Sequence, residues 1–177
     1  QNSDYPIGHG APVLSAKNWV GNDNFAMMFC DDIVYATRPG ISQLVEAWEA
    51  SPQLSGVIMT SPSAADQIHQ FSSVKVKPGS ESDKIRILED YIEKLSPEQV
   101  FTLEAIIGRA VYSAKIMEEL EKNRFSHRDS HGEFSTWDAM ISMTKYSDIG
   151  VLKIDGEWLT TGNDEQMRYT AKRLLGN

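Results

Sequence analysis

Two adjacent acidic residues, Asp31 and Asp32, directly follow an apolar run, FAMMFC at 25–30. A run of this length and character predicts a strand that is buried on both faces. The carboxyl ends of strands in open α/β sheets are where ligands bind, and Mg²⁺ takes carboxylate oxygens together with substrate phosphates. The pair therefore indicates either a Mg²⁺ site or, as the simpler alternative, two acids that end a strand and begin a turn.

A short glycine-bearing loop, Ile7-Gly8-His9-Gly10, stands just before Pro12 and the start of a predicted helix. A loop of this kind brings backbone N–H groups close to a ligand. It lacks the G-x-G-x-x-G and G-x-x-x-x-G-K-S/T patterns of nucleotide-binding loops. A plain turn, with His9 hydrogen-bonded inside it, is therefore the alternative.

A third candidate pair, Glu93-Lys94, lies at the end of a predicted alternating strand. The carboxylate can accept hydrogen bonds from sugar hydroxyl groups and the ammonium can bind a phosphate, although a solvated ion pair fits the same pattern. His69, His127 and His131 have no partners at metal-binding spacing, and no G-x-S-x-G or C-x-x-C motif occurs. Zinc chemistry and acyl-enzyme chemistry are therefore disfavoured.

The elements that must position these residues alternate between helices and apolar strands. Helices are predicted at 12–20 and 41–50, and a short apolar strand at 56–60 follows the one at 25–30. Because a parallel return between two strands needs a crossover helix, this order predicts an α/β fold with a mixed, mostly parallel sheet flanked by helices.

The second half of the chain contains the remaining predicted elements. Two alternating runs around the turn cluster PGSESD predict an antiparallel hairpin, and a strand is predicted at 104–112. Helices are predicted at 113–122, from an N-cap at Ser135 or Thr136, and from an N-cap at Asn163 to the end of the chain. Two short strands, VLKID and EWLTT, are predicted between the last two helices.

Length, net charge and cysteine content exclude several classes of protein. The chain has 177 residues, so we expect one domain over 1–177, and its 17 Lys and Arg against 25 Asp and Glu leave a net charge of −8. A chain this acidic has no global field to hold a nucleic-acid backbone or an anionic membrane, and no apolar run is long enough for a transmembrane helix. The single cysteine, Cys30, cannot form an internal disulfide, which favours a reducing, cytoplasmic location.

The motifs occur in an order that resembles a known enzyme family. After Gln1 the chain contains PIGHG, FAMMFCDD, YIEK, EAIIGRAVYSAKI, GEFSTWDAM and GEWLTTG. This set resembles the sugar-nucleotide pyrophosphorylases, and among them the bacterial and archaeal UTP-glucose-1-phosphate uridylyltransferases. The resemblance implies a Rossmann-like nucleotidyltransferase core that transfers a uridylyl group from UTP to glucose 1-phosphate. The products are UDP-glucose and pyrophosphate, and the cofactor is Mg²⁺.

The resemblance also implies a role for individual residues. Gln1 and Gly8, with His9 beside Gly8, correspond to the nucleotide-binding positions, and Asp31 corresponds to the catalytic aspartate that holds Mg²⁺. On the sugar-phosphate side, three positions correspond to the family's binding residues. Glu93 would bind the glucose hydroxyls, Lys94 would act as the catalytic cation beside the sugar phosphate, and Ser72 stands where the family usually has a glycine.

Thr160 occupies the place of the family's second metal-binding aspartate. A hydroxyl is a poor substitute for a carboxylate on Mg²⁺, because the site loses a unit of charge. Either Mg²⁺ is held by Asp31 with phosphates and waters, or Asp32, Asp155 or Asp164 contributes, or the chain is a divergent relative.

The family's N-terminal strand and glycine-rich phosphate loop have no counterpart in this sequence, which begins at Gln1. We interpret the chain as a piece of a longer intracellular enzyme, with little activity of its own; a domain secreted after cleavage before Gln1 is the alternative. Open sheet edges then favour a homo-oligomer. Two other functions stay open: a pyrophosphorylase for another base or sugar, such as thymidylyl transfer, and a non-catalytic homologue that binds sugar nucleotides.

Overall fold

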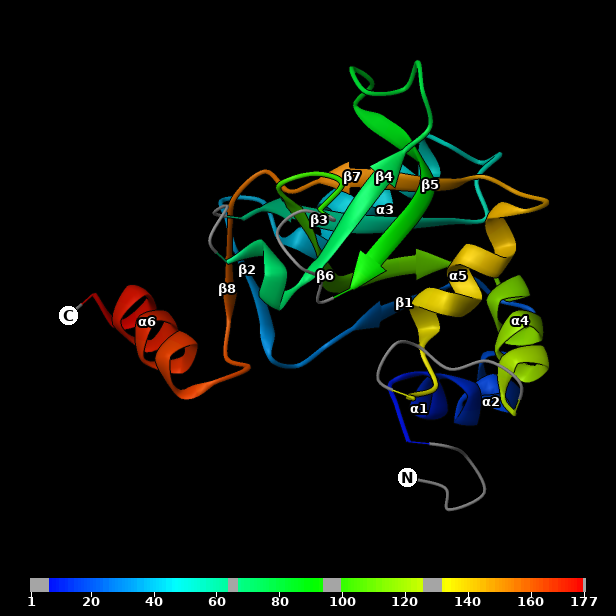
Figure 1. Ribbon diagram of the computed structural model, residues 1–177, viewed down its shortest axis with the longest axis horizontal. Coiled ribbons are helices and arrows are strands. Elements are labelled where there is room, and N and C mark those ends of the chain that lie inside the picture. Colours follow the sequence, from blue (N-terminus) through cyan, green and yellow to red (C-terminus); the bar gives the residue numbers. More distant parts are fainter. Residues whose placement is uncertain (1–6, 64–66, 94–99, 126–131, 177) are drawn as a thin grey trace.

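The computed structural model describes residues 7–63, 67–93, 100–125 and 132–176 (Figure 1). The strands in these ranges are β1 Phe25–Met28, β2 Asp32–Tyr35, β3 Gly56–Pro62, β4 Ser72–Val76, β5 Ile85–Glu93, β6 Glu104–Tyr112, β7 Ile149–Lys153 and β8 Glu157–Thr160. The helices are α1 Gly10–Ser15, α2 Lys17–Val20, α3 Gly40–Glu49, the 3₁₀ helix η1 Ile68–Gln70, α4 Lys115–Asn123, α5 Thr136–Thr144 and α6 Asp164–Leu175. Not one of these helices has the length and apolarity needed to cross a lipid bilayer.

Six strands form one mixed sheet in the order β1-β6-β3-β7-β5-β4, and β2 pairs with β8 in a separate two-stranded sheet. β4 also pairs with β6, where Ser73 lies opposite Ala105, so β6, β3, β7, β5 and β4 close into a ring. β1 pairs with β6 on one side, and its other edge has no partner strand in the described ranges.

The predicted α/β class is confirmed, but the prediction of a mostly parallel sheet is wrong. In the described sheet only β3 and β7 pair in parallel, with Gly56 opposite Ile149, and every other pairing is antiparallel. β5 follows β4 through the predicted hairpin, and a hairpin forces an antiparallel pair. β6 lies between β1 and β3 and runs opposite to both.

The prediction that the strand at 25–30 is buried on both faces is also wrong. Met27 is buried in a core cluster, but Ala26 and Met28 are exposed, because they point to the other face of the strand and belong to neither core cluster. The strands in the middle of the sheet, β3 and β6, are instead buried along almost their whole length.

Elements that depend on local sequence signals agree closely with the predictions. The strand at 104–112 has the predicted bounds. Ser135 caps α5 by accepting a hydrogen bond from the Trp137 N–H, and Asn163 caps α6 by accepting one from the Gln166 N–H. The predicted helix at 12–20 is divided into α1 and α2.

Two apolar clusters form the core on the two faces of the sheet. β3 contributes residues to both clusters: Ile58 packs into one, and Val57 and Met59 pack into the other. Helices α1, α4 and α5 cover the first face and α3 covers the second (Figure 1). α6 stands to one side of the sheet and packs mainly against β8. The two-stranded β2–β8 sheet therefore connects the core to this last helix.

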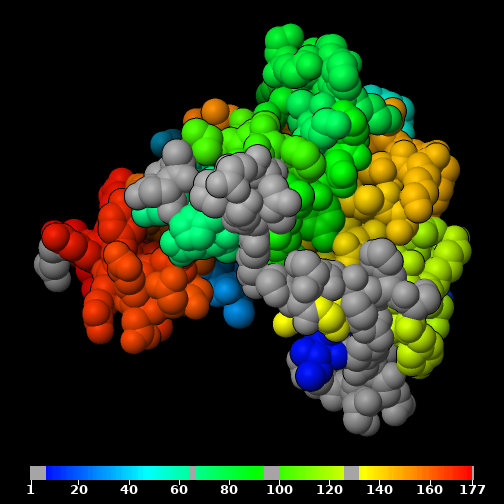
Figure 2. Space-filling model, in the orientation of Figure 1, coloured from blue at the N-terminus to red at the C-terminus, as the bar shows by residue number. Residues whose placement is uncertain are grey.

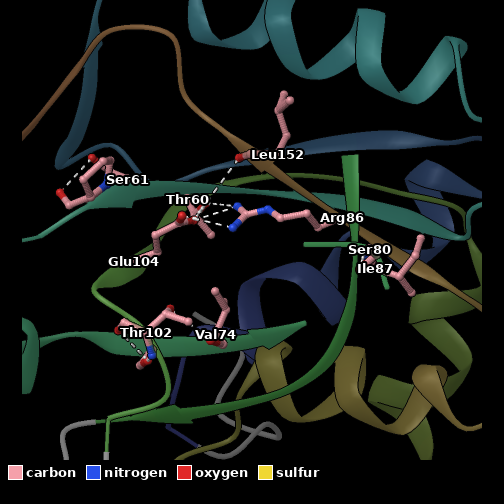
Figure 3. Close-up of polar contacts among 11 residues, drawn as sticks. Thr60, Ser61, Val74, Ser80, Arg86, Ile87, Thr102, Glu104 and Leu152 are labelled. Carbon is pink, nitrogen blue, oxygen red and sulfur yellow. Dashed lines mark hydrogen bonds and ion pairs between the residues drawn. The ribbon is translucent and has the colours of Figure 1, made fainter. Parts of the chain in front are cut away.

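A largely buried ion pair joins four strands of the ring (Figure 3). Arg86 of β5 donates two hydrogen bonds to the Glu104 carboxylate of β6, at 3.0 and 2.6 Å, and the side chains are 12% and 17% exposed. Thr60 of β3 donates to the same carboxylate and weakly, at 3.5 Å, to the Leu152 carbonyl of β7. Burial alone would raise the pKa of Glu104, but the hydrogen bonds and charge of Arg86 outweigh it and hold that pKa below its ordinary value.

Candidate functional site

The two acidic residues after β1 have opposite environments. Asp31 is exposed, and its main-chain carbonyl accepts a hydrogen bond of 2.9 Å from the Thr161 N–H. Asp32 is 7% exposed, and its carboxylate accepts bonds of 2.6 Å from the Gly108 N–H of β6 and from the Trp158 indole Nε1 of β8. Asp32 therefore ties three strands together, while Asp31 keeps its carboxylate available for a ligand.

The carboxylate of Asp32 has a raised pKa, chiefly because burial disfavours its charged form. The hydrogen bonds from Trp158 and Gly108 act in the opposite direction without cancelling the effect of burial. With both oxygens already accepting protein hydrogen bonds, Asp32 is unsuited to the metal-binding role that the sequence left open for it.

Arg109 of β6 holds both ends of the turn that carries Asp31. Its guanidinium donates to the Phe29 carbonyl at 2.6 Å and also to the Asp32 carbonyl. The preceding residue, Gly108, also shapes the turn, because a Cβ atom there would lie under 3.0 Å from the Phe29 side chain. The Gly108-Arg109 pair of β6 thus fixes the conformation of the acidic turn.

Thr160 faces the acidic turn across the small sheet. The register of β2 and β8 places Thr160 directly opposite Asp32 and Glu157 opposite Tyr35. The loop that holds Asp155 therefore lies at the far end of this ribbon from Asp31, and Asp164 begins α6.

In the described ranges no group of three or more His, Cys, Asp or Glu side chains is arranged to hold a metal. The donor set at the acidic turn consists of the exposed Asp31 carboxylate, while Thr160 lies opposite Asp32 on β8 and its hydroxyl accepts a hydrogen bond of 3.4 Å from the Gly162 N–H. This set fits Mg²⁺, which binds proteins through one or two carboxylates and completes its shell with waters and substrate phosphates.

The glycine-bearing loop packs against the start of α5. Gly8 has a φ of +133°, and a Cβ atom there would overlap the Phe134 main chain. The Phe134 N–H donates to the Ile7 carbonyl at 2.8 Å, and the Gly10 N–H donates back to the Phe134 carbonyl at 2.9 Å. Glycine at position 8 is therefore required by this close approach of two backbones.

His9 continues the same contact with its side chain. Nδ1 accepts a hydrogen bond of 3.3 Å from the Thr136 N–H, and Nε2 lies 3.1 Å from the Ser135 hydroxyl that caps α5. The ring also packs beside Phe29 and Trp137, with centroids 5.3 and 5.4 Å away. His9 thus connects the loop to both the α5 terminus and the residue that begins the acidic turn.

The sugar-side candidates lie on a different part of the sheet. Ser72 and Glu93 are cross-strand partners in the β4–β5 hairpin, with Ser72 buried and Glu93 half-buried. Nearby, the Tyr91 hydroxyl donates a bond of 2.7 Å to Asp138 of α5, and burial together with that carboxylate raises the pKa of Tyr91. Gln1 and Lys94 lie outside the described residues.

Two pockets flank the acidic turn. A groove of about 540 Å³ between β1 and the α1–α2 segment includes His9 and Asp31. A more polar pocket of about 440 Å³ between β8, α6 and η1 includes Thr160. The described linings of these two pockets contain neither Ser72 nor Glu93. The structure therefore brings His9 and Asp31 together but places the sugar-side pair apart from them.

Sequence reasoning missed three residues that shape this region. Arg109, Trp158 and Phe134 reach the turn or the loop from β6, β8 and the segment before α5. Arg109 and Trp158 stood inside the quoted motifs EAIIGRAVYSAKI and GEWLTTG, but nothing in their own surroundings pointed to the acidic turn.

Comparison with known proteins finds sequence similarity to uridylyltransferases. No family model matches it. It is 26% identical over 157 residues to a UTP–glucose-1-phosphate uridylyltransferase of Bacillus subtilis (strain 168), covering 89% of this chain and 51% of that protein. It is 32% identical over 122 residues to the protein of the same name from Streptococcus pneumoniae serotype 4, covering 67% of this chain and 40% of that protein. The chain thus spans about half the length of the curated relatives it matches.

The fold matches a crystal structure of a UDP-glucose pyrophosphorylase complexed with UDP-glucose. The TM-score is 0.85 at 18% sequence identity, and the match covers 96% of this chain and 62% of that one. A likeness at this identity establishes the mixed α/β architecture.

Proposed function

We propose that this chain, which is related to the sugar-nucleotide pyrophosphorylases, is the nucleotidyltransferase core of an enzyme that transfers a uridylyl group from UTP to glucose 1-phosphate. The products are UDP-glucose and pyrophosphate. One observation carries the proposal: relatives found by sequence and a neighbour found by fold are named for the same reaction.

The reaction needs orientation and charge more than acid–base chemistry. A phosphate oxygen of glucose 1-phosphate attacks the α-phosphorus of UTP, and the bond to the departing pyrophosphate breaks. Because the attacking group is already an anion, neither a general base nor a covalent intermediate is required. The contribution of the protein is to hold the two substrates in line and to offset their negative charge.

We assign Mg²⁺ to Asp31. When bound, Mg²⁺ supplies positive charge to the phosphate oxygens. Asp31 would hold it with the one exposed carboxylate of the acidic turn, and the bonds from Arg109 and Thr161 to the turn backbone would keep that carboxylate in place. Thr160 would contribute a hydroxyl from the facing strand.

The remaining assignments follow the family resemblance. Lys94 would offset charge on the attacking phosphate, and Gln1 and Gly8, with His9, would bind the nucleotide. Glu93 would bind glucose hydroxyls from its place opposite Ser72.

The test is Mg²⁺-dependent formation of UDP-glucose from UTP and glucose 1-phosphate, measured by chromatography. It should be run on this chain and on the longest polypeptide in which the sequence occurs naturally, with dTTP, CTP and GTP as competing donors. We expect UTP to be the preferred donor and Asp31→Ala to abolish turnover. Preference for dTTP would instead identify a thymidylyltransferase, and UDP-glucose binding without turnover would identify a non-catalytic homologue.

We also propose that the chain forms a homo-oligomer through the open edge of β1. Because the Phe29 N–H donates to the Gly108 carbonyl, the alternation of an antiparallel pair directs the Ala26 and Met28 backbone groups outward. Such unpaired groups bind further strands. Ala26→Pro removes one outward N–H without touching the β6 bonds, so we expect it to lower the sedimentation coefficient to that of a monomer. A wild-type chain that is monomeric at high concentration would contradict the proposal.

A cytoplasmic location is part of the same proposal. Cys30 is an exposed free thiol, and such a thiol persists in a reducing compartment. Cell fractionation followed by thiol labelling would check both points, and recovery of oxidised protein from an extracytoplasmic fraction would contradict them.

A further inference from the structure

Tyr91 of β5 places its hydroxyl at the N-terminus of α5, where the proposed reaction gives it no role. The ring is half-buried and packs against the first core cluster. The hydroxyl donates a hydrogen bond of 2.7 Å to Asp138, in the first turn of α5, and forms a second bond with the Ser135 hydroxyl, which caps that helix. Tyr91 therefore ties the start of α5 to β5.

His9 reaches the same helix terminus from the glycine-bearing loop. Its Nε2 lies 3.1 Å from Ser135 Oγ, and its Nδ1 accepts a bond of 3.3 Å from the Thr136 N–H. Figure 2 shows the start of the described chain, in blue, against the yellow segment that precedes α5. Ser135, with 1% of its surface exposed, thus bonds to His9 from the loop and to Tyr91 from the sheet. We call His9, Ser135, Tyr91 and Asp138 the α5 network.

The hydrogen-bond donors of the α5 network all point in one direction. Because Nδ1 of His9 accepts a bond, the proton of the neutral ring lies on Nε2 and is donated to Ser135 Oγ. Ser135 then has its own proton left for the Tyr91 oxygen, and Tyr91 donates to the Asp138 carboxylate. Burial and that carboxylate raise the pKa of Tyr91, so its hydroxyl keeps the proton that it donates. Each hydroxyl is a donor and an acceptor at once, which fixes its orientation.

The α5 network joins the two substrate sides of the proposed reaction. Tyr91 and Glu93 lie two residues apart on β5 and so on one face of the strand, and Glu93 is the candidate for the sugar hydroxyls. His9 stands beside Gly8 on the nucleotide side, and its ring contacts Phe29 at the start of the acidic turn. Loss of one bond in the network would therefore let the nucleotide side move relative to the sugar side.

We propose that Tyr91 is a positioning residue that fixes the separation of the nucleotide and sugar sides through Ser135 and His9. The inference rests on the proposed function, because it requires a ligand that fills both sides. Such a ligand gains affinity when the two sides are already held at the right separation, whereas a ligand that fills one side does not. Loss of the Tyr91 hydroxyl should therefore weaken only the ligand that spans both sides.

The test is isothermal titration calorimetry on the longest polypeptide in which the sequence occurs naturally. UDP-glucose spans both sides, whereas UMP fills the nucleotide side and glucose 1-phosphate fills the sugar side. Tyr91→Phe should weaken UDP-glucose binding at least about fivefold and leave the affinity for the two smaller ligands within about twofold of the wild type.

The matched control is Tyr146→Phe. The Tyr146 hydroxyl also donates to a carboxylate, that of Glu119 at 2.9 Å, but it lies just beyond the other end of α5. This variant should bind all three ligands as the wild type does. Thermal melts of both variants verify that they fold.

The three ligands separate failure of this inference from failure of the proposed function. If Tyr91→Phe binds UDP-glucose as the wild type does, the inference is overturned and the proposed function stands. The result is the same if UMP or glucose 1-phosphate is weakened as much as UDP-glucose, because Tyr91 would then shape one side and not the separation of the two. If the wild type binds none of the three ligands, the proposed function is overturned and the inference with it.

Discussion

The indole Nε1 of Trp158 donates a hydrogen bond of 2.6 Å to the buried carboxylate of Asp32. The two residues are far apart in the chain, and the bond joins β8 to the turn that carries Asp31. Because Trp158 also lines the polar pocket between β8, α6 and η1, one side chain connects the candidate metal turn to that pocket.

Trp158→Phe should destabilise the fold. The substitution keeps an aromatic ring but removes the donor to a buried carboxylate, a loss of about 1.5–3 kcal/mol. Urea unfolding followed by circular dichroism measures it. Trp19→Phe is the matched control, since Trp19 is 90% exposed and should unfold at the wild-type midpoint. Equal midpoints for the two variants would show that the Asp32 bond contributes nothing.

Asp31→Ala and Asp32→Ala should differ strongly in their effect on the free energy of unfolding. Removing the Asp32 carboxylate leaves the Gly108 N–H and the Trp158 N–H without their acceptor, which should cost about 3 kcal/mol. Removing the exposed Asp31 carboxylate should change the free energy of unfolding by less than about 0.5 kcal/mol. Calorimetry on the pair decides the point; a strongly destabilised Asp31 variant would mean that its side chain has a structural role.

Gly108→Ala should destabilise the chain by about 1–3 kcal/mol, because the new methyl group overlaps the Phe29 side chain close to its backbone. Gly162→Ala is the control, since its Cβ would meet nothing closer than the flexible end of Gln166, at 3.2 Å. Denaturant midpoints of the two variants are compared. Similar midpoints would show that Phe29 moves aside without cost.

The Glu104–Arg86 pair should make stability depend on pH. The pKa of Glu104 is lower in the folded chain than its ordinary value of 4.5, so the charged form favours folding. This stabilisation is complete above that value and is lost as the pH falls through the lower, folded pKa.

Glu104→Gln should therefore be less stable than the wild type at neutral pH, by about 3 kcal/mol, and the difference should shrink in acid. Urea titrations at several pH values measure this trend. Glu46→Gln, at the exposed pair with Arg38, should lose at most about 1 kcal/mol. A Glu104→Gln difference that does not vary with pH would refute the linkage.

Elements whose signals are local could be predicted from the sequence. The caps at Ser135 and Asn163, the strand at 104–112 and the hairpin around PGSESD each depend on a few neighbouring residues, and the structure confirms them.

Relations between distant segments could not be predicted in this way. Asp31 and Asp32 are adjacent and identical in type, yet one is exposed and the other buried. Their difference comes from Trp158 and Arg109, which the fold brings in from other strands. The direction of β6 was missed for the same reason, since β1 and β3 meet it only after the chain has folded.

The single parallel pairing of the described sheet bears on how the chain folds during synthesis. Gly56 of β3 is translated long before its partner Ile149 of β7, and β4, β5, β6, α4 and α5 are made in between. At a ribosomal rate of about 5–20 residues per second, several seconds pass between the synthesis of the apolar β3 and the synthesis of β7. Pairing between segments so distant also slows folding, typically to milliseconds or seconds. The nascent chain therefore presents an aggregation-prone strand in that interval, and its soluble yield should rise when a chaperone is supplied during synthesis.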